Sequence, residues 1–159
     1  NEIFAFCKLI IKSNLKFKYL VLGDYSHLSK RHKKLISQFN KSSKIDFVGF
    51  QKNINRYISI SHFAYYPTKY REGVPRFLIE SLANGLIIFT NSMPGCSKIV
   101  SKNNGYIDLS AAEVINQISK IDLKLFKEKS ALSKGLFNEI YSDNIVFPKY
   151  FKILKENEI

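Results

Sequence analysis

Apolar residues follow two different periods along the first two thirds of the chain. Short apolar runs between glycine, proline or polar residues are typical of buried strands, and they occur at 17–23, 45–49, 63–67, 86–90 and 106–108. Apolar residues three or four positions apart are typical of helices with one buried face, and they occur at 2–12, 28–39, 54–60 and 75–84. Because the two patterns alternate, the sequence predicts an α/β fold with a doubly wound parallel sheet that helices cover on both faces.

The rest of the chain is patterned as helix, and the predicted helices occupy 111–119, 123–141 and 145–157. The chain has 159 residues, which is the usual size of one domain. No linker, repeat or low-complexity segment interrupts it, so the sequence predicts a single domain over residues 1–159. No apolar run approaches the roughly 20 residues that a membrane-spanning helix needs.

The charge of the chain changes this picture little. The sequence has 25 basic and 13 acidic residues and a formal net charge of +12. A basic surface attracts nucleic acid, anionic lipid or phosphorylated substrates. The basic residues are spread along the chain, however, and no nucleic-acid-binding motif accompanies them. Solvated lysines are therefore the first interpretation, and nucleic-acid binding is ranked last.

Several kinds of chemistry lack their sequence signature. Cys7 and Cys96 are far apart and fit neither a disulfide framework nor a zinc motif. The three histidines have no ligand spacing, and the chain contains no glycine-rich dinucleotide motif, no P-loop and no Ser-His-Asp signature. The sequence thus predicts no metal site and no cofactor.

The richest candidate site is the segment YREGVPRFLIE, residues 70–80, between a predicted strand and a predicted helix. In open α/β sheets, ligands bind at the carboxyl ends of the strands, which is where this segment lies. Pro75 fits the first turn of a helix, which makes Val74 the expected N-cap. Glu72 and Gly73 then lie in the loop before the helix.

Two glutamates flank this expected helix start. The free N–H groups of a first helical turn and the helix dipole form an anion site, and a carboxylate can accept hydrogen bonds from hydroxyls. Glu72 and Glu80 therefore suit a sugar and a ribose on either side of a diphosphate. A structural interpretation stays open at this point, in which Glu72 only complements the helix dipole and Glu80 forms a surface ion pair with Arg76.

A longer stretch, residues 70–100, resembles the donor-binding segment of retaining family-4 glycosyltransferases with the GT-B fold. The shared signature is a Glu-x7-Glu spacing at Glu72 and Glu80, a glycine that closes the helix at Gly85, and a Pro-Gly turn at 94–95. The same resemblance runs through YLVLGD, IDFVGF and NNGYID at 19–24, 45–50 and 103–108. It is greatest to bacterial enzymes that build capsule, O-antigen or undecaprenyl-diphosphate-linked glycans.

The resemblance implies that the chain is one half of a GT-B enzyme, a Rossmann-like C-terminal nucleotide-sugar-binding domain without the N-terminal acceptor domain. It implies that Glu72 is the catalytic residue, in contact with hydroxyls of the donor sugar, and that Glu80 binds the ribose. It further implies donor-binding roles for Gly73 and Val74 at the helix start, for Gly49, Phe50 and Gln51 near the base, and for Arg76.

The activity that the resemblance implies is transfer of a sugar, with retention, from a UDP-sugar to a lipid-linked or saccharide acceptor in bacterial surface polysaccharide biosynthesis. A UDP-N-acetylhexosamine fits the donor, and no cofactor is implied because the nucleotide-sugar is a substrate. This chain alone is expected to bind nucleotide weakly and to be inactive. The expected location is the cytoplasm, with peripheral association at the inner face of the membrane as an option.

Two departures from the family pattern leave an alternative open. Lys98 stands where a glutamate is frequent, and nothing matches the basic pair that holds the diphosphate, which we expect before Asn1. A degenerate, non-catalytic α/β module that binds protein or membrane is therefore the alternative. In the last predicted helix, Lys149, Lys152 and Lys155 lie opposite Phe151 and Leu154. The first interpretation of this lysine face is that it is solvated, and the second is that it lies on a membrane surface.

Overall fold

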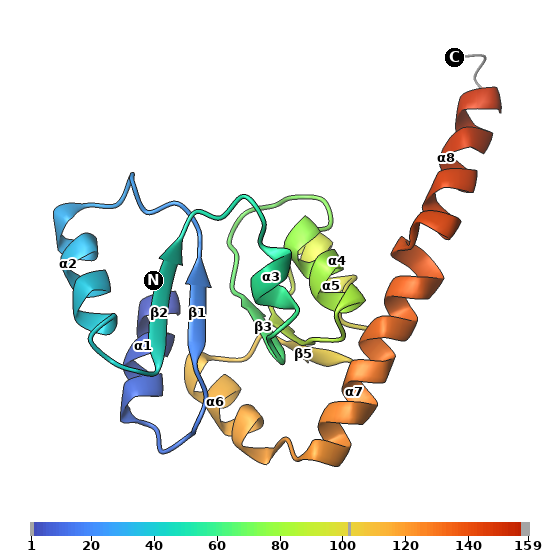
Figure 1. Cartoon of the computed structure of the whole chain (residues 1–159). Helices are drawn as coiled ribbons and strands as arrows, with labels where there is room; N and C mark the ends of the chain where they lie inside the picture. The colour runs from blue at the N-terminus through green and yellow to red at the C-terminus, as the bar shows by residue number, and fades with distance from the viewer. Residues whose placement is uncertain (1, 102, 157–159) are drawn as a thin grey trace. The chain divides into compact units, whose positions relative to one another are not determined.

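The computed structural model describes residues 2–101 and 103–156, which form two compact units. The first unit comprises residues 2–60 and 109–120, and the second comprises residues 61–101, 103–108 and 121–156. Figure 1 shows the helices and strands of both, coloured along the chain. Each unit has its own strands and its own buried residues, so each is described by itself.

The first unit pairs two parallel strands, β1 (Tyr19–Leu22) and β2 (Ile45–Gly49). Its helices are α1 (Glu2–Lys12), α2 (Lys30–Phe39), α3 (Asn55–Ile58) and α6 (Ala111–Lys120). Tyr19 lies opposite Ile45, and the register shifts between Val21 and Leu22. The shift is a local irregularity at the end of the strand pair, immediately before the glycine that ends β2.

Aromatic rings fill the core of the first unit. The ring of Phe39 stacks on Phe47 at 6.1 Å between centroids, and Phe4 lies 5.8 Å from Phe39. α1 contributes the fully buried side chains of Cys7 and Ile10. Burial raises the pKa of the Cys7 thiol to about 12, so this cysteine stays protonated and serves as a packing residue.

The second unit is built on a parallel sheet with the strand order β3-β4-β5. The strands are β3 (Phe63–Tyr66), β4 (Ile87–Thr90) and β5 (Gly105–Ile107). The helices are α4 (Arg76–Ala83), α5 (Pro94–Ser97), α7 (Leu123–Leu136) and α8 (Asp143–Glu156), and a π-helical turn at Phe137–Tyr141 joins α7 to α8. β4 lies between its two neighbours, in register with both.

The core of the second unit forms around β4. All four residues of this strand are buried, and both α4 and α7 pack against it. Leu78 and Leu82 of α4 are fully buried. Gly85 ends α4 with φ of +74°, a left-handed conformation that favours glycine and turns the chain into β4. This short connection fixes the direction of α4 relative to the sheet, and with it the position of the helix start.

The predicted α/β class with parallel strands is confirmed. The strands pair in two sets, β1-β2 and β3-β4-β5, one set in each unit. The prediction of a single domain over residues 1–159 stays a prediction. Among the described residues, no helix is both long and apolar enough to cross a bilayer.

The observed helices and strands begin or end at different residues from those predicted at a few short segments. The strand predicted at 17–23 is shorter, and the helix predicted at 145–157 begins at Asp143; its last predicted residue, Asn157, lies outside the described residues. α5 was read as a loop, because a four-residue segment of Pro, Gly, Cys and Ser has the composition of a turn.

Candidate functional site

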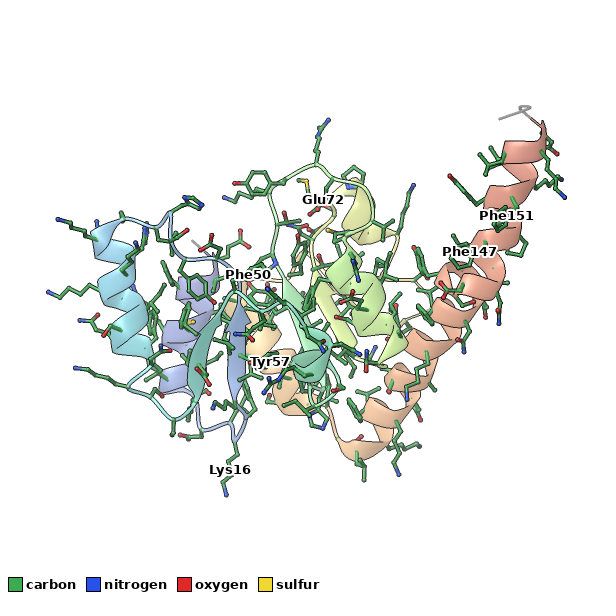
Figure 2. The ribbon with its side chains drawn as sticks, turned by 45° about the horizontal axis from the view of Figure 1, so that its top comes forward. Lys16, Phe50, Tyr57, Glu72, Phe147 and Phe151 are labelled. Carbon is green, nitrogen blue, oxygen red and sulfur yellow. The ribbon has the colours of Figure 1, made fainter. Side chains whose placement is uncertain are left out.

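The β3–α4 loop, residues 67–75, leaves the sheet of the second unit at the edge where the strands end. Because β3, β4 and β5 are parallel, their last residues Tyr66, Thr90 and Ile107 lie at one edge. This is the edge at which open parallel sheets bind ligands. Glu72 is labelled in this loop in Figure 2.

The carboxylate of Glu72 is held from the sheet. The hydroxyl of Tyr66, the last residue of β3, donates a hydrogen bond of 2.9 Å to Glu72 Oε1. In the part of the chain that the structure describes, no hydrogen bond reaches the other oxygen of Glu72. The glutamate is exposed, so its second oxygen is available to a ligand.

The backbone beside Glu72 rests on a glycine of α5. A Cβ atom added to Gly95 would lie 2.6 Å from the carbonyl oxygen of Glu72 and closer still to that of Gly73. Real Cβ atoms essentially never come within 3.0 Å of such neighbours. Only glycine at position 95 therefore permits the loop and α5 to approach this closely.

Hydrogen bonds also tie the start of the loop to β4 and the residues after it. Thr90 Oγ1 donates to the carbonyl of Tyr66 at 2.9 Å, and the side-chain amide of Asn91 donates to the carbonyl of Thr68. Within the loop, the backbone N–H of Tyr70 donates to Thr68 Oγ1 at 3.1 Å. These bonds fix the path of the chain as it leaves the sheet.

The start of α4 is one residue later than predicted. Pro75 occupies the N-cap position with ψ of 126°, and the helix begins at Arg76, so the prediction of Val74 as N-cap is wrong. The extended ψ of Pro75 keeps it out of the first turn. Among the residues that the structure describes, no side chain caps this helix start, and no acidic residue lies in its first turn. The first N–H groups, at Arg76 and Phe77, are therefore directed away from the helix without an intrahelical acceptor.

Glu80 forms the ion pair that the structural interpretation expected. Arg76 Nε donates to Glu80 Oε1 at 2.7 Å, and the arginine side chain is 91% exposed against 24% for the glutamate. Such an exposed pair adds little to stability. The second oxygen of Glu80 is buried and has no hydrogen-bond partner among the described residues. Each of the two glutamates thus has one oxygen engaged by the protein and one left over.

The other predicted donor-binding residues lie in the first unit. Gly49 ends β2 with φ of +84°, and no atom lies within 4 Å of where its Cβ would be. Phe50 follows with a side chain that is 70% exposed, as labelled in Figure 2, and Gln51 donates from its amide to the carbonyl of Val48 at 3.3 Å. They lie at the carboxyl end of their own strand, and their role near the base stays a prediction.

The negative charge of Glu72 also affects the pKa of the nearby Cys96 thiol. Burial, and after it the negative charge of Glu72, raises the pKa of the Cys96 thiol, so this cysteine is not activated as a nucleophile. The described residues contain no cluster of three or more histidine, cysteine, aspartate or glutamate side chains that could hold a metal ion.

Sequence reasoning missed the residues that position the loop. The sequence does not single out Tyr66, because a tyrosine at a strand end more often packs than binds. Gly95 was recognised as part of a turn motif, but its contact with the backbone of Glu72 is visible only in three dimensions. The hydrogen bond from Asn91 to the loop was the one contact with a sign in the sequence, because Asn91 is a polar residue directly after a buried strand.

The chain belongs to the family described as Glycosyl transferases group 1, which matches residues 2–125. No curated protein sequence was found to match the chain. The family match, together with the fold, places the chain in the class of group 1 glycosyltransferase domains.

Solved structures share the fold of the chain. A glycosyltransferase from Rickettsia africae is 21% identical with a TM-score of 0.76, and the match covers 98% of this chain and 44% of that one. HepE from Anabaena, in complex with UDP-glucose, is 13% identical with a TM-score of 0.79, over 95% of this chain and 44% of HepE. The C-terminal domain of LpcC from Francisella tularensis is 17% identical with a TM-score of 0.72, over 89% and 78%. The chain thus spans less than half the length of the first two.

Proposed function

We propose that the chain is the donor-binding C-terminal domain of a retaining family-4 glycosyltransferase. The complete enzyme would transfer a sugar from a UDP-sugar to a lipid-linked or saccharide acceptor in bacterial surface polysaccharide synthesis. The observation that carries the proposal is the exposed Glu72, with one oxygen held by Tyr66 and the other open to a ligand, beside Glu80 and an uncapped helix start at the ligand-binding edge of a parallel sheet.

The proposed roles follow from what each group can donate or accept. Glu72 would accept hydrogen bonds from hydroxyls of the donor sugar, and Glu80 from those of the ribose. The backbone at Gly73 and Val74 and the first N–H groups of α4 would hold the diphosphate, whose charge increases as the glycosidic bond breaks. Arg76 would orient Glu80 through its Nε, and its other guanidinium N–H groups would contact the donor.

The choice of a UDP-sugar is supported by structures of the same fold. HepE was solved with UDP, with UDP-glucose, and with UDP and glucose. WaaG, another protein of this fold, is involved in lipopolysaccharide biosynthesis. A hexose or N-acetylhexosamine on UDP is therefore the first class of donor to test.

The test is a titration of the isotope-labelled protein with UDP, UDP-glucose and UDP-N-acetylglucosamine, followed through backbone amide shifts. We expect the amides of Gly73, Arg76 and Phe77 to shift at millimolar ligand or below. Residues at the opposite end of the second unit, such as Leu123, should not respond. Binding with no shift between 72 and 80, or no binding at all, would contradict the proposal.

A non-catalytic module is the alternative, motivated by Lys98 and by the unmatched basic pair. Lys98 is exposed at the C-cap of α5. The two readings differ in the complete protein: in a transferase, Glu72→Ala and Glu80→Ala should each reduce sugar transfer by about 100-fold, the scale seen when one stabilising group is removed from a transition state. Normal transfer by both variants would favour the module.

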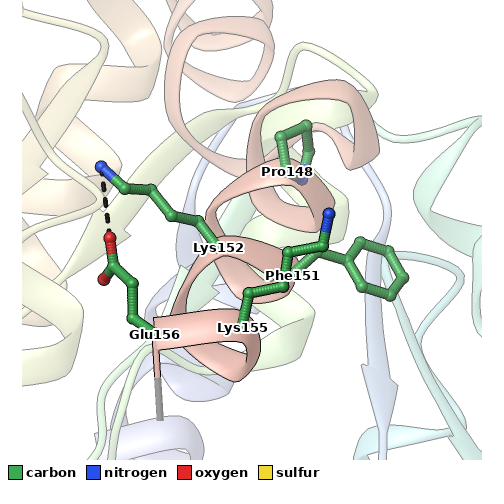
Figure 3. A pocket seen from close by; sticks show the side chains of 5 residues that line it. All are labelled: Pro148, Phe151, Lys152, Lys155 and Glu156. Carbon is green, nitrogen blue, oxygen red and sulfur yellow. Dashed lines mark ion pairs between the residues drawn. The ribbon is translucent and has the colours of Figure 1, made fainter. Parts of the chain in front are cut away.

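Peripheral membrane association forms part of the proposal because of α8. Apolar residues on one arc of this helix are exposed, namely Val146, Phe147, Tyr150, Phe151 and Ile153. The opposite arc carries Lys149, Lys152 and Lys155. Figure 2 labels Phe147 and Phe151, and Figure 3 shows the shallow hollow at the end of α8, where Lys152 pairs with Glu156 at 3.6 Å. An apolar face beside lysines suits the surface of an anionic bilayer.

A further inference from the structure

Tyr66 stands out because it connects the buried sheet to the exposed Glu72. Its hydroxyl donates to Glu72 Oε1 at 2.9 Å, across six positions of the chain. The consequence of this contact for Glu72 can be worked out from the geometry.

The tyrosine is itself fixed in place. Its ring packs against that of Phe77 in α4, with 5.8 Å between the ring centroids. Its carbonyl accepts a hydrogen bond of 2.9 Å from Thr90 Oγ1 in the neighbouring strand. Desolvation, followed by the contact with Glu72, raises the pKa of Tyr66 to about 12, so the hydroxyl remains a donor at every pH in which the protein would work.

Glu72 is then restrained at two points. Its carbonyl lies against Gly95 of α5, which positions the backbone, and its Oε1 accepts from Tyr66, which orients the side chain. A free glutamate side chain has several rotamers, and ordering it on binding weakens the affinity for a ligand. A glutamate oriented before the ligand arrives avoids this loss.

We propose that Tyr66 is a positioning residue for Glu72, holding one carboxylate oxygen so that the other is presented to the hydroxyls of a nucleotide-sugar donor. The inference rests on the proposed function, because it needs Glu72 to contact the sugar. It goes further by assigning the orientation of that carboxylate to a tyrosine of the sheet and by predicting that this tyrosine acts only on ligands that carry a sugar.

The test compares binding of UDP with binding of UDP-glucose and UDP-N-acetylglucosamine by calorimetry. Tyr66→Phe removes only the hydroxyl, and Glu72→Ala removes the group it positions. Tyr150→Phe, on an exposed position of α8 in the same unit, is the matched control. We expect Tyr66→Phe to weaken UDP-sugar binding about 10-fold, the effect of losing one hydrogen bond to a charged group. UDP binding, and both affinities of the control, should stay within twofold.

A double-mutant cycle separates positioning from a general structural role. In protein that already carries Glu72→Ala, adding Tyr66→Phe should have no further effect on UDP-sugar binding, because the group that Tyr66 positions is gone. A purely structural tyrosine would instead weaken UDP and UDP-sugar equally and would keep its effect in the Glu72→Ala background. Either of those results would overturn the inference.

Failure of the proposed function would appear elsewhere in the same data. If the wild-type protein binds neither UDP nor a UDP-sugar, or if Glu72→Ala leaves UDP-sugar binding unchanged, the donor-site proposal fails. If wild type and Glu72→Ala behave as expected and Tyr66→Phe binds UDP-sugar like wild type, the site stands and the role of Tyr66 is refuted.

Discussion

Replacing Gly95 by alanine should displace the loop that carries Glu72. The added Cβ would lie 2.6 Å from the carbonyl oxygen of Glu72, whereas real Cβ atoms essentially never come within 3.0 Å of such an atom. This oxygen must therefore move by at least about 0.4 Å, and that of Gly73 by more. Both neighbours are backbone atoms, which cannot swing aside as the end of a flexible side chain can. Overpacking of this kind typically costs about 1–3 kcal/mol of folding free energy.

Two measurements check this prediction. Chemical denaturation should show the loss of about 1–3 kcal/mol, and calorimetry should show a loss of UDP-sugar affinity of about tenfold, as expected when Glu72 can no longer reach the sugar. The matched control is Gly135→Ala in α7, where a Cβ meets no atom within 4 Å. Alanine in an open helical position should stabilise the protein by about 0.5–1 kcal/mol. Gly95→Ala with wild-type stability and affinity would refute the contact between α5 and the loop.

Three further predictions concern stability and the surface. Burial raises the pKa values of Tyr25 and Tyr66 to about 12, so the folded protein favours the neutral form of both side chains. The stability that the two tyrosines contribute in this way is complete below pH 10 and is lost as the pH rises from 10 to about 12. Denaturation at pH 9, 10 and 11 should show the fall, with a smaller slope in Tyr66→Phe. Lys129→Ala should lower the free energy of unfolding by about 2–4 kcal/mol, because this side chain is only 3% exposed, fills the core and donates to the carbonyl of Asn103 at 2.7 Å. Lys129→Met keeps most of the packing and should lower it less. Sedimentation with vesicles should show that Phe151→Ser weakens binding to anionic lipid; no binding of the wild-type protein would exclude the membrane role of α8.

The fold was predictable from the sequence because its determinants are local. β4 is an unbroken apolar run, and Gly85, which ends α4, is followed directly by that run, so the strand, the helix end and their order can all be read from the letters. The start of α4 was less clear. Pro75 fits either the N-cap or the first turn, and its ψ angle, which no sequence pattern reports, places it at the N-cap.

The sequence predicted which residues form the candidate site, but not the contacts that hold them in place. The spacing of Glu72 and Glu80 located the loop and the helix, and the possible pair of Arg76 with Glu80 follows from their separation by one helical turn. The contacts of Tyr66 with Glu72 and of Gly95 with the loop join residues brought together by strand order and by α5. Such contacts depend on how the loop returns across the sheet edge, which local patterns do not encode.

The arrangement also argues against the two glutamates acting as an acid and base pair. Each carboxylate already accepts a hydrogen bond from the protein, Glu72 from a tyrosine hydroxyl and Glu80 from a guanidinium. Both donors stabilise a carboxylate that continues to accept, and the exposed oxygen that remains on Glu72 is suited to a hydroxyl donor of a ligand. In the proposed transferase, the charge on the departing diphosphate would then be met by other groups, the N–H groups at the start of α4 and cations supplied from outside the loop. In Glu72→Gln, the side-chain NH2 can donate to the oxygen of Tyr66 while the single acceptor oxygen faces the sugar. We therefore expect Glu72→Gln to retain more UDP-sugar affinity than Glu72→Ala; equal losses in the two variants would show that the negative charge, and not the hydrogen bond, is what the sugar requires.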